Sequence, residues 1–536
     1  MTFEVNYTDL AARIGKLETP HGILETPAFV PVVHPVRQSI SPDFIKSLGF
    51  GAVITNAYIT LRHFGDEARK SGIHRIINYD GVIMTDSGGY QVLQYGSIKV
   101  KAPVIAQFEK DIRSDICVPL DKPTGYGLEY EKAKGYVIQT LLNAKETLMM
   151  VTDENGETEK HITKKEDRYS HESIWAGPIQ GAEHLDLVRY SAEELDKMGF
   201  ELMALGSPVE ILEAYDFSVL GRMIAAAKCA VPTKPIHLFG AGHPLTIPLV
   251  VALGCDMFDS ASYILYAKDN RYMHANGTVK LEDLTYLPCH CPVCTSHTVK
   301  ELLSEDKNKR TMEIAKHNLY ILKAEMCLVK QAIVDGRLWE YIIQKARAHP
   351  KLMESIELLK NFELLEEGTQ VFKQKALFLY DPLDQYRPEA RQFRKMVSKF
   401  KSSKTCGTDG RRRLILYPES NIHPFYTTQD FKKIAKKFPD AQVCTYNRFL
   451  GIIPVEICDI FPAAHNLTSK DLKTFQANDY PSFINSLEEF LAENNFEEII
   501  IVADVFMRDI IDNNTILLKK FKTKIFDYEQ GVISRL

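Results

Sequence analysis

The chain has 536 residues, a formal net charge of −5 and 45% hydrophobic residues. This length exceeds what one hydrophobic core supports and predicts two to four domains. The longest apolar runs fall short of the roughly 18 residues of a membrane-spanning helix, and the ten cysteines, thinly spread apart from one cluster, do not predict a disulfide framework. The first residues resemble no signal peptide. We therefore expect a cytoplasmic protein without a membrane partner.

Short β-branched runs alternate with helical stretches over the first two-thirds of the chain, which is typical of a parallel sheet. Seven such runs lead into a polar residue or a glycine. They are residues 52–55, 82–84, 116–120, 174–179, 202–205, 236–239 and 257–258, and they lead to Asn56, Asp86, Asp121, Gln180, Gly206, Gly240 and Asp259. This spacing predicts a (β/α)8 TIM barrel, in which the carboxyl ends of the strands build one site. A doubly wound sheet is the alternative that periodicity does not exclude.

Four polar side chains at the ends of these strands are the candidate site. In a barrel, Asp86, Asp121, Gln180 and Asp259 meet in space although they are far apart in the sequence. A single aspartate at a strand end is explained equally well as the cap of the following helix. Three aspartates together with a glutamine and glycine-rich turns favour a chemical site instead.

A cysteine cluster predicts a zinc-binding insertion after the last of these strands. Cys289, Cys291 and Cys294 place three thiols within six residues, and soft thiolates favour zinc. The helix expected from Thr311 onward carries His317, which we expect as the fourth ligand. His290 and His297 are rival ligands, but each lies so close to the thiols that its geometry is awkward. Four protein ligands close the tetrahedron, so one structural zinc ion is predicted rather than a catalytic one.

The sequence beyond residue 345 loses the barrel pattern. We expect a TIM-barrel domain with the zinc site at residues 1–345, a helical and basic connecting domain at 346–411, and a smaller α/β accessory domain at 412–536. Nine Lys and Arg residues lie between Arg391 and Arg413, opposed only by Asp409. This basic run is either a solvated linker or a strip that contacts nucleic-acid phosphates.

The motifs at the strand ends resemble those of the tRNA-guanine transglycosylases, in particular the archaeal, archaeosine-forming branch. The matching segments are residues 85–91 (TDSGGYQ), 118–121 (VPLD), 177–181 (GPIQG), 237–244 (HLFGAGHP), 252–261 (ALGCDMFDSA) and 265–268 (LYAK). The zinc pattern, with 22 residues between Cys294 and His317, belongs to the same set. The resemblance is close over residues 1–345 and looser beyond them.

The resemblance implies roles for individual residues. Asp259 matches the nucleophile that attacks the ribose C1′, and Asp86 matches the general acid/base that protonates the leaving base. Further matches are base contacts, namely Asp121, Gln180, the backbone at Gly206, Ser87 and the stacking ring of Tyr90. Two positions depart from the family: Ser207 follows Gly206 where a second glycine is more common, and Tyr90 stands where phenylalanine is common.

The resemblance also implies the substrates and partners. It predicts exchange of guanine at position 15 of the tRNA D-loop for 7-cyano-7-deazaguanine (preQ0), the precursor of archaeosine. A homodimer is a further expectation from the family. The RNA-binding PUA domain of archaeal members is not expected in this chain, and a separate PUA-bearing polypeptide is the corresponding hypothesis. The alternatives are a catalytically silent tRNA-binding subunit of the same fold and an enzyme acting on the nitrile after its insertion.

Overall fold

The computed structural model describes residues 2–89, 100–151, 172–404, 406–407, 410–420, 422–469, 479–513, 521–529 and 532–536. Two compact units divide the chain, Met1–Gly368 and Thr369–Leu536. The boundary between the units lies inside the predicted connecting segment 346–411. None of the helices seen in the described ranges has the length and hydrophobicity needed to cross a lipid bilayer.

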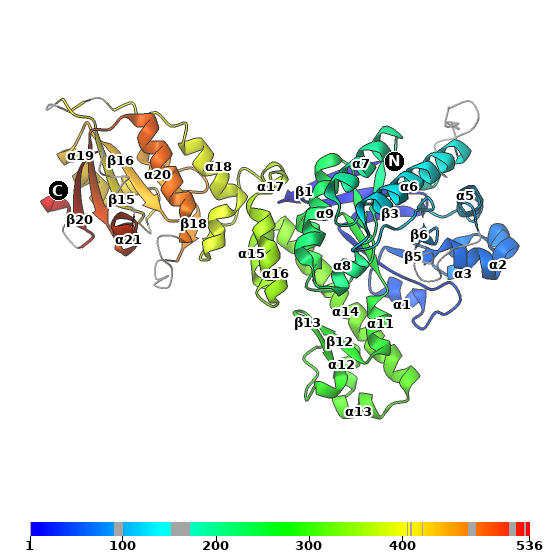
Figure 1. Ribbon diagram of the computed structural model, residues 1–536. Coiled ribbons are helices and arrows are strands. Elements are labelled where there is room, and N and C mark those ends of the chain that lie inside the picture. The colour runs from blue at the N-terminus through cyan, green and yellow to red at the C-terminus, as the bar shows by residue number, and fades with distance from the viewer. Residues whose placement is uncertain are drawn as a thin grey trace, which may run out of the picture. The chain divides into compact units, whose positions relative to one another are not determined.

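An eight-stranded parallel barrel forms the centre of the first unit, as predicted (Figure 1). Its strands, in their spatial order, are β4 (Ala28–Pro31), β11 (Met257–Ser260), β10 (Ile236–Leu238), β9 (Leu202–Leu205), β8 (Ile174–Ile179), β7 (Ile116–Cys117), β6 (Val82–Asp86) and β5 (Ala52–Asn56). A parallel bridge from Val32 to Ile54 joins the two ends of the row and closes the barrel. The seven predicted strands are all present. The eighth, β4, was not predicted.

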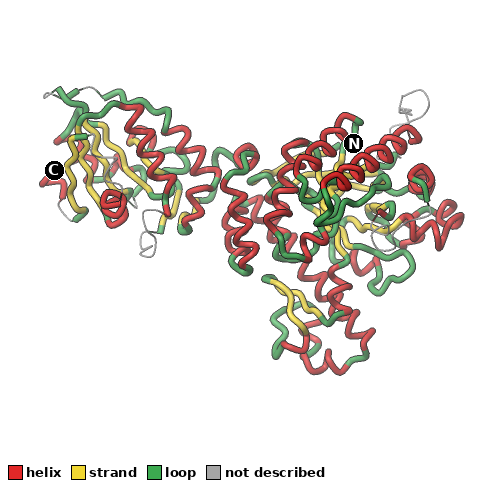
Figure 2. Tube along the Cα trace, in the orientation of Figure 1, coloured by secondary structure: helices red, strands yellow, loops and turns green. Residues whose placement is uncertain are grey.

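Helices alternate with these strands along the chain, and in the tube drawing the helices (red) lie around the strands (yellow) of this unit (Figure 2). They are α1 (Pro42–Ser47), α2 (Ala57–Ser71), α3 (Ile73–Ile77), α5 (Ala102–Asp111), α6 (Tyr130–Val151), α7 (Leu185–Lys197), α8 (Val209–Glu213), α9 (Phe217–Ala230), α10 (Ile247–Ala252) and α11 (Ser262–Lys268). The barrel interior is filled by inward-pointing apolar side chains, among them Val30, Ile54 and Met84. A packed interior leaves the strand ends as the place for polar chemistry.

An antiparallel sheet precedes the barrel and was not predicted. It consists of β1 (Phe3–Asp9), β2 (Ala12–Thr19) and β3 (Gly22–Thr26). Leu17 and Leu24 from this sheet belong to the same buried cluster as the barrel residues, so the sheet covers apolar surface of the barrel.

The cysteine-bearing insertion follows β11 and α11. It contains the hairpin β12 (Arg271–His274) and β13 (Gly277–Lys280), then α12 (Pro292–Ser296), α13 (Val299–Ser304) and the long helix α14 (Lys307–Val334). Helix α14 starts four residues before the predicted Thr311, because Asp306 caps it by accepting from the backbone N–H groups of Asn308 and Lys309. Helices α15 (Leu338–Ala346), α16 (Pro350–Ser355) and α17 (Leu364–Gly368) complete the unit.

The second unit has its own α/β core, with the strand order β17-β16-β15-β19-β20. These strands are β15 (Arg413–Pro418), β16 (Gln442–Asn447), β17 (Gly451–Pro454), β19 (Glu498–Ala503) and β20 (Lys522–Asp527). The other α-helices and strands that the structure describes in this unit are β14 (Leu377–Leu379), α18 (Pro388–Val397), α19 (Gln429–Lys437), β18 (Asn466–Thr468), α20 (Pro481–Asn494), α21 (Val505–Asn513) and α23 (Val532–Arg535). All pairings in the larger sheet are parallel except that of β16 with β17.

Part of the basic run is used inside this second unit. The Arg394 guanidinium donates to the backbone carbonyls of Gln385 and Phe449, and Arg413 pairs with the buried Glu498 at 2.6 Å. Lys395 and Lys399 are exposed. The run is therefore partly structural, and its contact with nucleic acid stays a prediction.

Candidate active site

A cavity of about 540 Å³ lies at the carboxyl ends of the barrel strands. Asp86, Asp121, Gln180, Gly206 and Asp259 all line it. Five residues separated by as many as 173 positions thus share one cavity, as the barrel topology predicted. Ser87 is fully buried beside it and is not among the lining side chains. Tyr90 lies outside the described residues.

Asp259 sits in β11 and is held by two groups from the neighbouring strand and loop. The imidazole Nε2 of His237, on β10, lies 3.0 Å from Asp259 Oδ1, and the backbone N–H of Gly240 donates to the same oxygen at 3.2 Å. Both contacts end on one carboxylate oxygen, and Oδ2 has no donor among the described residues. The carboxylate is therefore fixed in orientation while one oxygen is left for other chemistry.

Asp86, at the end of β6, has a different environment. Asn56, at the end of β5, donates to Asp86 Oδ2 at 3.1 Å, and the backbone N–H of Gly88 also bonds to this carboxyl. Burial raises the pKa of Asp86 to about 6, and the charge of Asp259 adds to this increase. Near neutral pH, Asp86 therefore exchanges a proton readily, as a general acid/base requires.

Asp121 follows β7 and forms a hydrogen-bonded pair with Gln180. The amide Nε2 of Gln180 donates to Asp121 Oδ2 at 2.6 Å. Burial raises the pKa of Asp121 to about 7, with a further contribution from the charge of Asp86. The pair offers a carboxylate acceptor beside an amide donor at the same wall of the cavity.

Two glycines make room for this pair. A Cβ at Gly89 would lie 1.7 Å from Asp121 Oδ1, and a Cβ at Gly206 would lie 2.2 Å from Gln180 Nε2. Both positions therefore require glycine if the two side chains are to keep their places. The Gly206 N–H donates to the carbonyl of Ile179 at 2.9 Å, so this donor is already used within the barrel. A base contact by the backbone at Gly206 stays a prediction.

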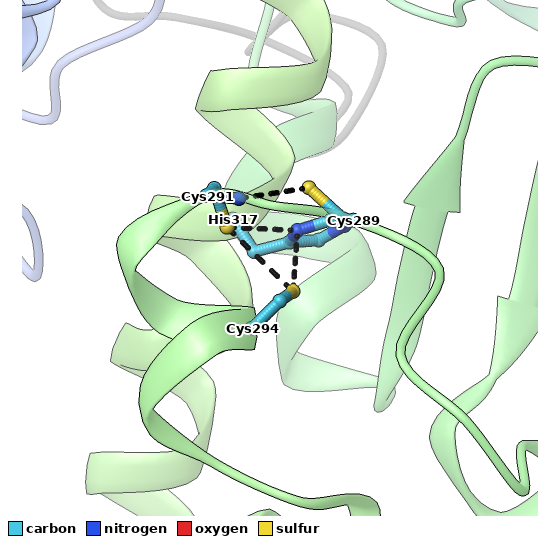
Figure 3. A group of neighbouring side chains, drawn as sticks. All are labelled: Cys289, Cys291, Cys294 and His317. Atoms are coloured by element: carbon cyan, nitrogen blue, oxygen red, sulfur yellow. Dashed lines mark hydrogen bonds between the residues drawn. The ribbon is translucent and has the colours of Figure 1, made fainter.

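The cysteine cluster assembles as the sequence predicted (Figure 3). Cys289 lies in the loop before α12, Cys291 and Cys294 lie at the start of α12 and within it, and His317 comes from α14. The His317 Nδ1 is 3.5 Å from Cys291 Sγ and 3.3 Å from Cys294 Sγ, and the two sulfurs are 3.6 Å apart. These four residues could hold one metal ion. The rival His297 bonds instead to the carbonyl of Val293 at 3.0 Å.

Sequence reasoning missed four residues that orient the predicted side chains, and one of them, Thr124, which donates to Gln180 Oε1, was not singled out at all. Asn56 was seen only as a strand-end residue, His237 only as part of a motif, and Ser207 only as a departure from a family pattern. A histidine inside an apolar strand usually reads as a core residue. The signal available for His237 was its place on the strand next to that of Asp259, which becomes visible only once the barrel order is assumed.

Three aspartates with unequal environments around one cavity at the carboxyl ends of the strands of a TIM barrel are typical of an enzyme's active site. Residues 9–351 match the family described as queuine tRNA-ribosyltransferase (TGT). The chain therefore belongs to the tRNA-guanine transglycosylase family.

Proteins named tRNA-guanine(15) transglycosylase are similar to this chain over most of their length. The protein from Sulfolobus acidocaldarius is 38% identical over 94% of this chain and 95% of its own. The one from Saccharolobus solfataricus is 38% identical over 93% of this chain and 96% of its own. The one from Methanosarcina acetivorans is 42% identical over 74% of this chain and 78% of its own. The first two alignments are long enough to include most of the second unit.

Proposed function

We propose that this protein exchanges guanine at position 15 of tRNA for 7-cyano-7-deazaguanine through a covalent ribosyl–aspartate intermediate. The observation that carries the proposal is the placement of Asp86 and Asp259 on one cavity in unequal environments. The position in tRNA is supported by the names of the relatives. The incoming base is supported by the resemblance to the archaeal, archaeosine-forming branch.

The first half of the proposed reaction releases guanine. A carboxylate oxygen of Asp259 attacks the ribose C1′, the bond from C1′ to guanine N9 breaks, and its electron pair goes to the base. Asp86 supplies a proton to the leaving guanine and becomes ionised. This is the retaining double displacement of glycosidases, in which one carboxylate is the nucleophile and the other moves the proton.

The second half reverses these roles with a new base. The ionised Asp86 takes the proton from the incoming 7-deazaguanine, whose ring nitrogen attacks C1′ while the bond to Asp259 breaks. Both carboxylates return to their starting states, and no electrons are exchanged with an oxidant or reductant. The pKa of Asp86, raised to about 6, suits a group that must both give and take a proton in one cycle.

Asp121 and Gln180 are the proposed readers of the base edge. Guanine offers N1–H and N2–H donors beside the O6 acceptor. The Asp121 carboxylate suits the donors and the Gln180 amide suits the oxygen, and the two lie 2.6 Å apart. Ser87 and the stacking ring of Tyr90 complete the proposed base contacts. The base must leave the tRNA stack to enter the cavity.

Zinc is the proposed metal of the cysteine cluster. With about 2.3 Å to sulfur and about 2.0–2.1 Å to nitrogen, a tetrahedral zinc ion sets its ligand atoms roughly 3.5–3.8 Å apart, close to the 3.3–3.6 Å found here. The Nε2 of His317 lies 2.8 Å from the carbonyl of Met273, which keeps its proton on Nε2 and turns Nδ1 toward the thiols. Bound zinc would brace α12 against α14, and no step of the exchange uses it.

The proposed setting includes the other partners. We expect the protein to act on tRNA in the cytoplasm, as a homodimer, and a separate PUA-bearing polypeptide is a candidate partner for tRNA binding. Copurification and tRNA affinity measured with and without candidate partners test this last point. Full tRNA affinity of the chain alone would count against a partner in trans.

Exchange of radiolabelled guanine into unmodified tRNA tests the proposed function. We expect Asp259→Ala and Asp86→Ala to abolish exchange, and Asp283→Ala, an exposed aspartate of the insertion, to leave it unchanged. Retained exchange in Asp259→Ala would overturn the mechanism. If the unaltered protein binds tRNA tightly and exchanges no guanine, it is the silent subunit instead. A tRNA changed at position 15 identifies the site of exchange.

A further inference from the structure

Ser207 adopts a backbone conformation that serine rarely takes. Its φ angle is +63°, in the left-handed region that glycine occupies at no steric cost. It lies directly after Gly206, in the loop that follows β9 at the mouth of the cavity, and it lines that cavity. A non-glycine residue persists in such a conformation only where the surrounding structure compensates for it. The compensation here is made by its side chain.

The Ser207 hydroxyl connects three loops of the barrel mouth. Its Oγ lies 2.8 Å from Gln180 Oε1, in the loop after β8, and it accepts from the backbone N–H of Gly125, in the loop after β7, at 3.3 Å. Because Gly125 N–H is a donor only, the hydroxyl proton is free to point at Gln180 Oε1. The Ser207 hydroxyl thus acts as an acceptor on one side and a donor on the other.

Gln180 Oε1 collects further donors from Thr124. The backbone N–H of Thr124 donates to it at 3.0 Å and the Thr124 hydroxyl at 3.1 Å. The Thr124 hydroxyl in turn accepts from the N–H of Gly181 at 3.2 Å. A backbone N–H is only ever a donor, so these contacts identify Oε1 as the oxygen of the Gln180 amide. The amide nitrogen must then face Asp121, 2.6 Å away.

We infer that Ser207 is a positioning residue that fixes the direction of the Gln180 amide, so that its NH2 group faces Asp121 and the bound base. A flipped amide would place its oxygen against the Asp121 carboxylate and would offer no donor to a 6-oxo purine. The hydroxyl contributes nothing to bond breaking and acts only through Gln180. This inference rests on the proposed function, because it assigns the base edge to Gln180 and Asp121.

Two substitutions at Ser207 separate the hydroxyl from the backbone conformation. Ser207→Ala removes the hydroxyl and keeps a Cβ at positive φ. Ser207→Gly removes the hydroxyl and also the Cβ, which is the group that makes a positive φ sterically unfavourable. For both we expect KM for guanine to rise about 3- to 10-fold with kcat nearly unchanged, which is the size expected for one neutral hydrogen bond. Because both variants lose the same hydrogen bonds, the thermal midpoint of Ser207→Gly should lie about 1–2 °C above that of Ser207→Ala.

A matched control comes from the opposite end of the barrel. Asn78 also has positive φ, +57°, and it is exposed at the end of α3, before β6 begins. Asn78→Gly should leave both KM and kcat unchanged. That result would show that placing glycine at a position of positive φ does not by itself change base binding.

The experiment measures guanine exchange with purified full-length variants and their unfolding midpoints. Wild-type KM for guanine in both Ser207 variants overturns the inference, and so does a loss confined to kcat. Absence of exchange in the unaltered protein instead overturns the proposed function. In that case equilibrium binding of guanine to the same variants still tests the inference, which predicts a 3- to 10-fold weaker Kd and is overturned by equal affinity.

Discussion

His237 Nε2 lies 3.0 Å from Asp259 Oδ1, and this contact joins two neighbouring strands of the barrel, β10 and β11. His237 is fully buried, and its Nδ1 has no hydrogen-bond partner among the described residues. A neutral ring with its proton on Nε2 therefore satisfies the contact without burying an unpaired N–H. The imidazole thus holds the Asp259 carboxylate in place through Oδ1 and leaves Oδ2 for the attack on C1′ that we propose.

Removing this support should slow the exchange. We expect His237→Leu to lower kcat about 10- to 100-fold, the usual effect of losing a group that orients a reacting side chain. KM for guanine should change little, because His237 is not among the proposed base contacts. Steady-state guanine exchange measures both constants. His237→Gln keeps an N–H donor and should recover part of kcat, whereas equal losses in the two variants would indicate a packing effect.

The pH dependence of exchange should be a narrow bell. Asp86 donates only when protonated, and its pKa is about 6, so its acid form is lost as pH rises through 6. Asp121 accepts two donors only when ionised, and its pKa is about 7, so this form is lost as pH falls through 7. Because the two carboxyl groups interact, the apparent pKa values that define the limbs, near 6 and 7, belong to the pair and not to either residue alone. Asp86 acts as the acid in the half-reaction that starts from tRNA, so values of kcat/KM for tRNA from pH 5 to 9 measure the limbs. A flat profile over this range would contradict the prediction.

Asp121→Asn should stabilise the protein at high pH while it weakens base binding. Burial raises the pKa of Asp121 to about 7, so the folded protein favours the protonated carboxyl. The free energy of unfolding therefore falls as the pH rises through that value and the buried group becomes charged. Asparagine carries no charge and still accepts from Gln180. We expect unfolding free energy to increase by about 1–3 kcal/mol at pH 8 and by much less at pH 4. Denaturant unfolding at the two pH values measures this, and an equal effect at both would show that burial of the charge is not the cause.

The barrel could be predicted because seven of its strands lead into a polar residue or a glycine, which marks where each strand ends. The strand β4 was missed because Ala28–Pro31 runs into Val32 and Val33 without such an end, and its role in closing the barrel through Val32 and Ile54 is purely topological. The cysteine cluster could be predicted because three of its four residues are close in sequence. The order of the second unit's strands could not, since it depends on pairing between segments as distant as β15 and β19.

The candidate site was predictable as a set of residues and not as a network. Asp86, Asp121, Gln180 and Asp259 follow from strand ends and motifs. The contacts that orient them come from Asn56, His237, Thr124 and Ser207, whose partners lie 30, 22, 56 and 27 residues away in the sequence. No periodicity links residues at such separations, and only the folded barrel brings them together.

The metal cluster gives the last prediction. Cys294→Ser should reduce bound zinc from one ion per chain to well under one, and it should loosen the insertion, because α12 and α14 then lose the ion that joins them. His290→Ala, which removes the exposed rival ligand, should keep one zinc ion and the wild-type stability. Elemental analysis gives the stoichiometry, and hydrogen exchange over residues 271–334 reports the local opening. Activity should decline only as this region opens, in step with zinc removal by a chelator. Loss of zinc in His290→Ala with retention in His317→Ala would show that the histidine ligand has been assigned wrongly.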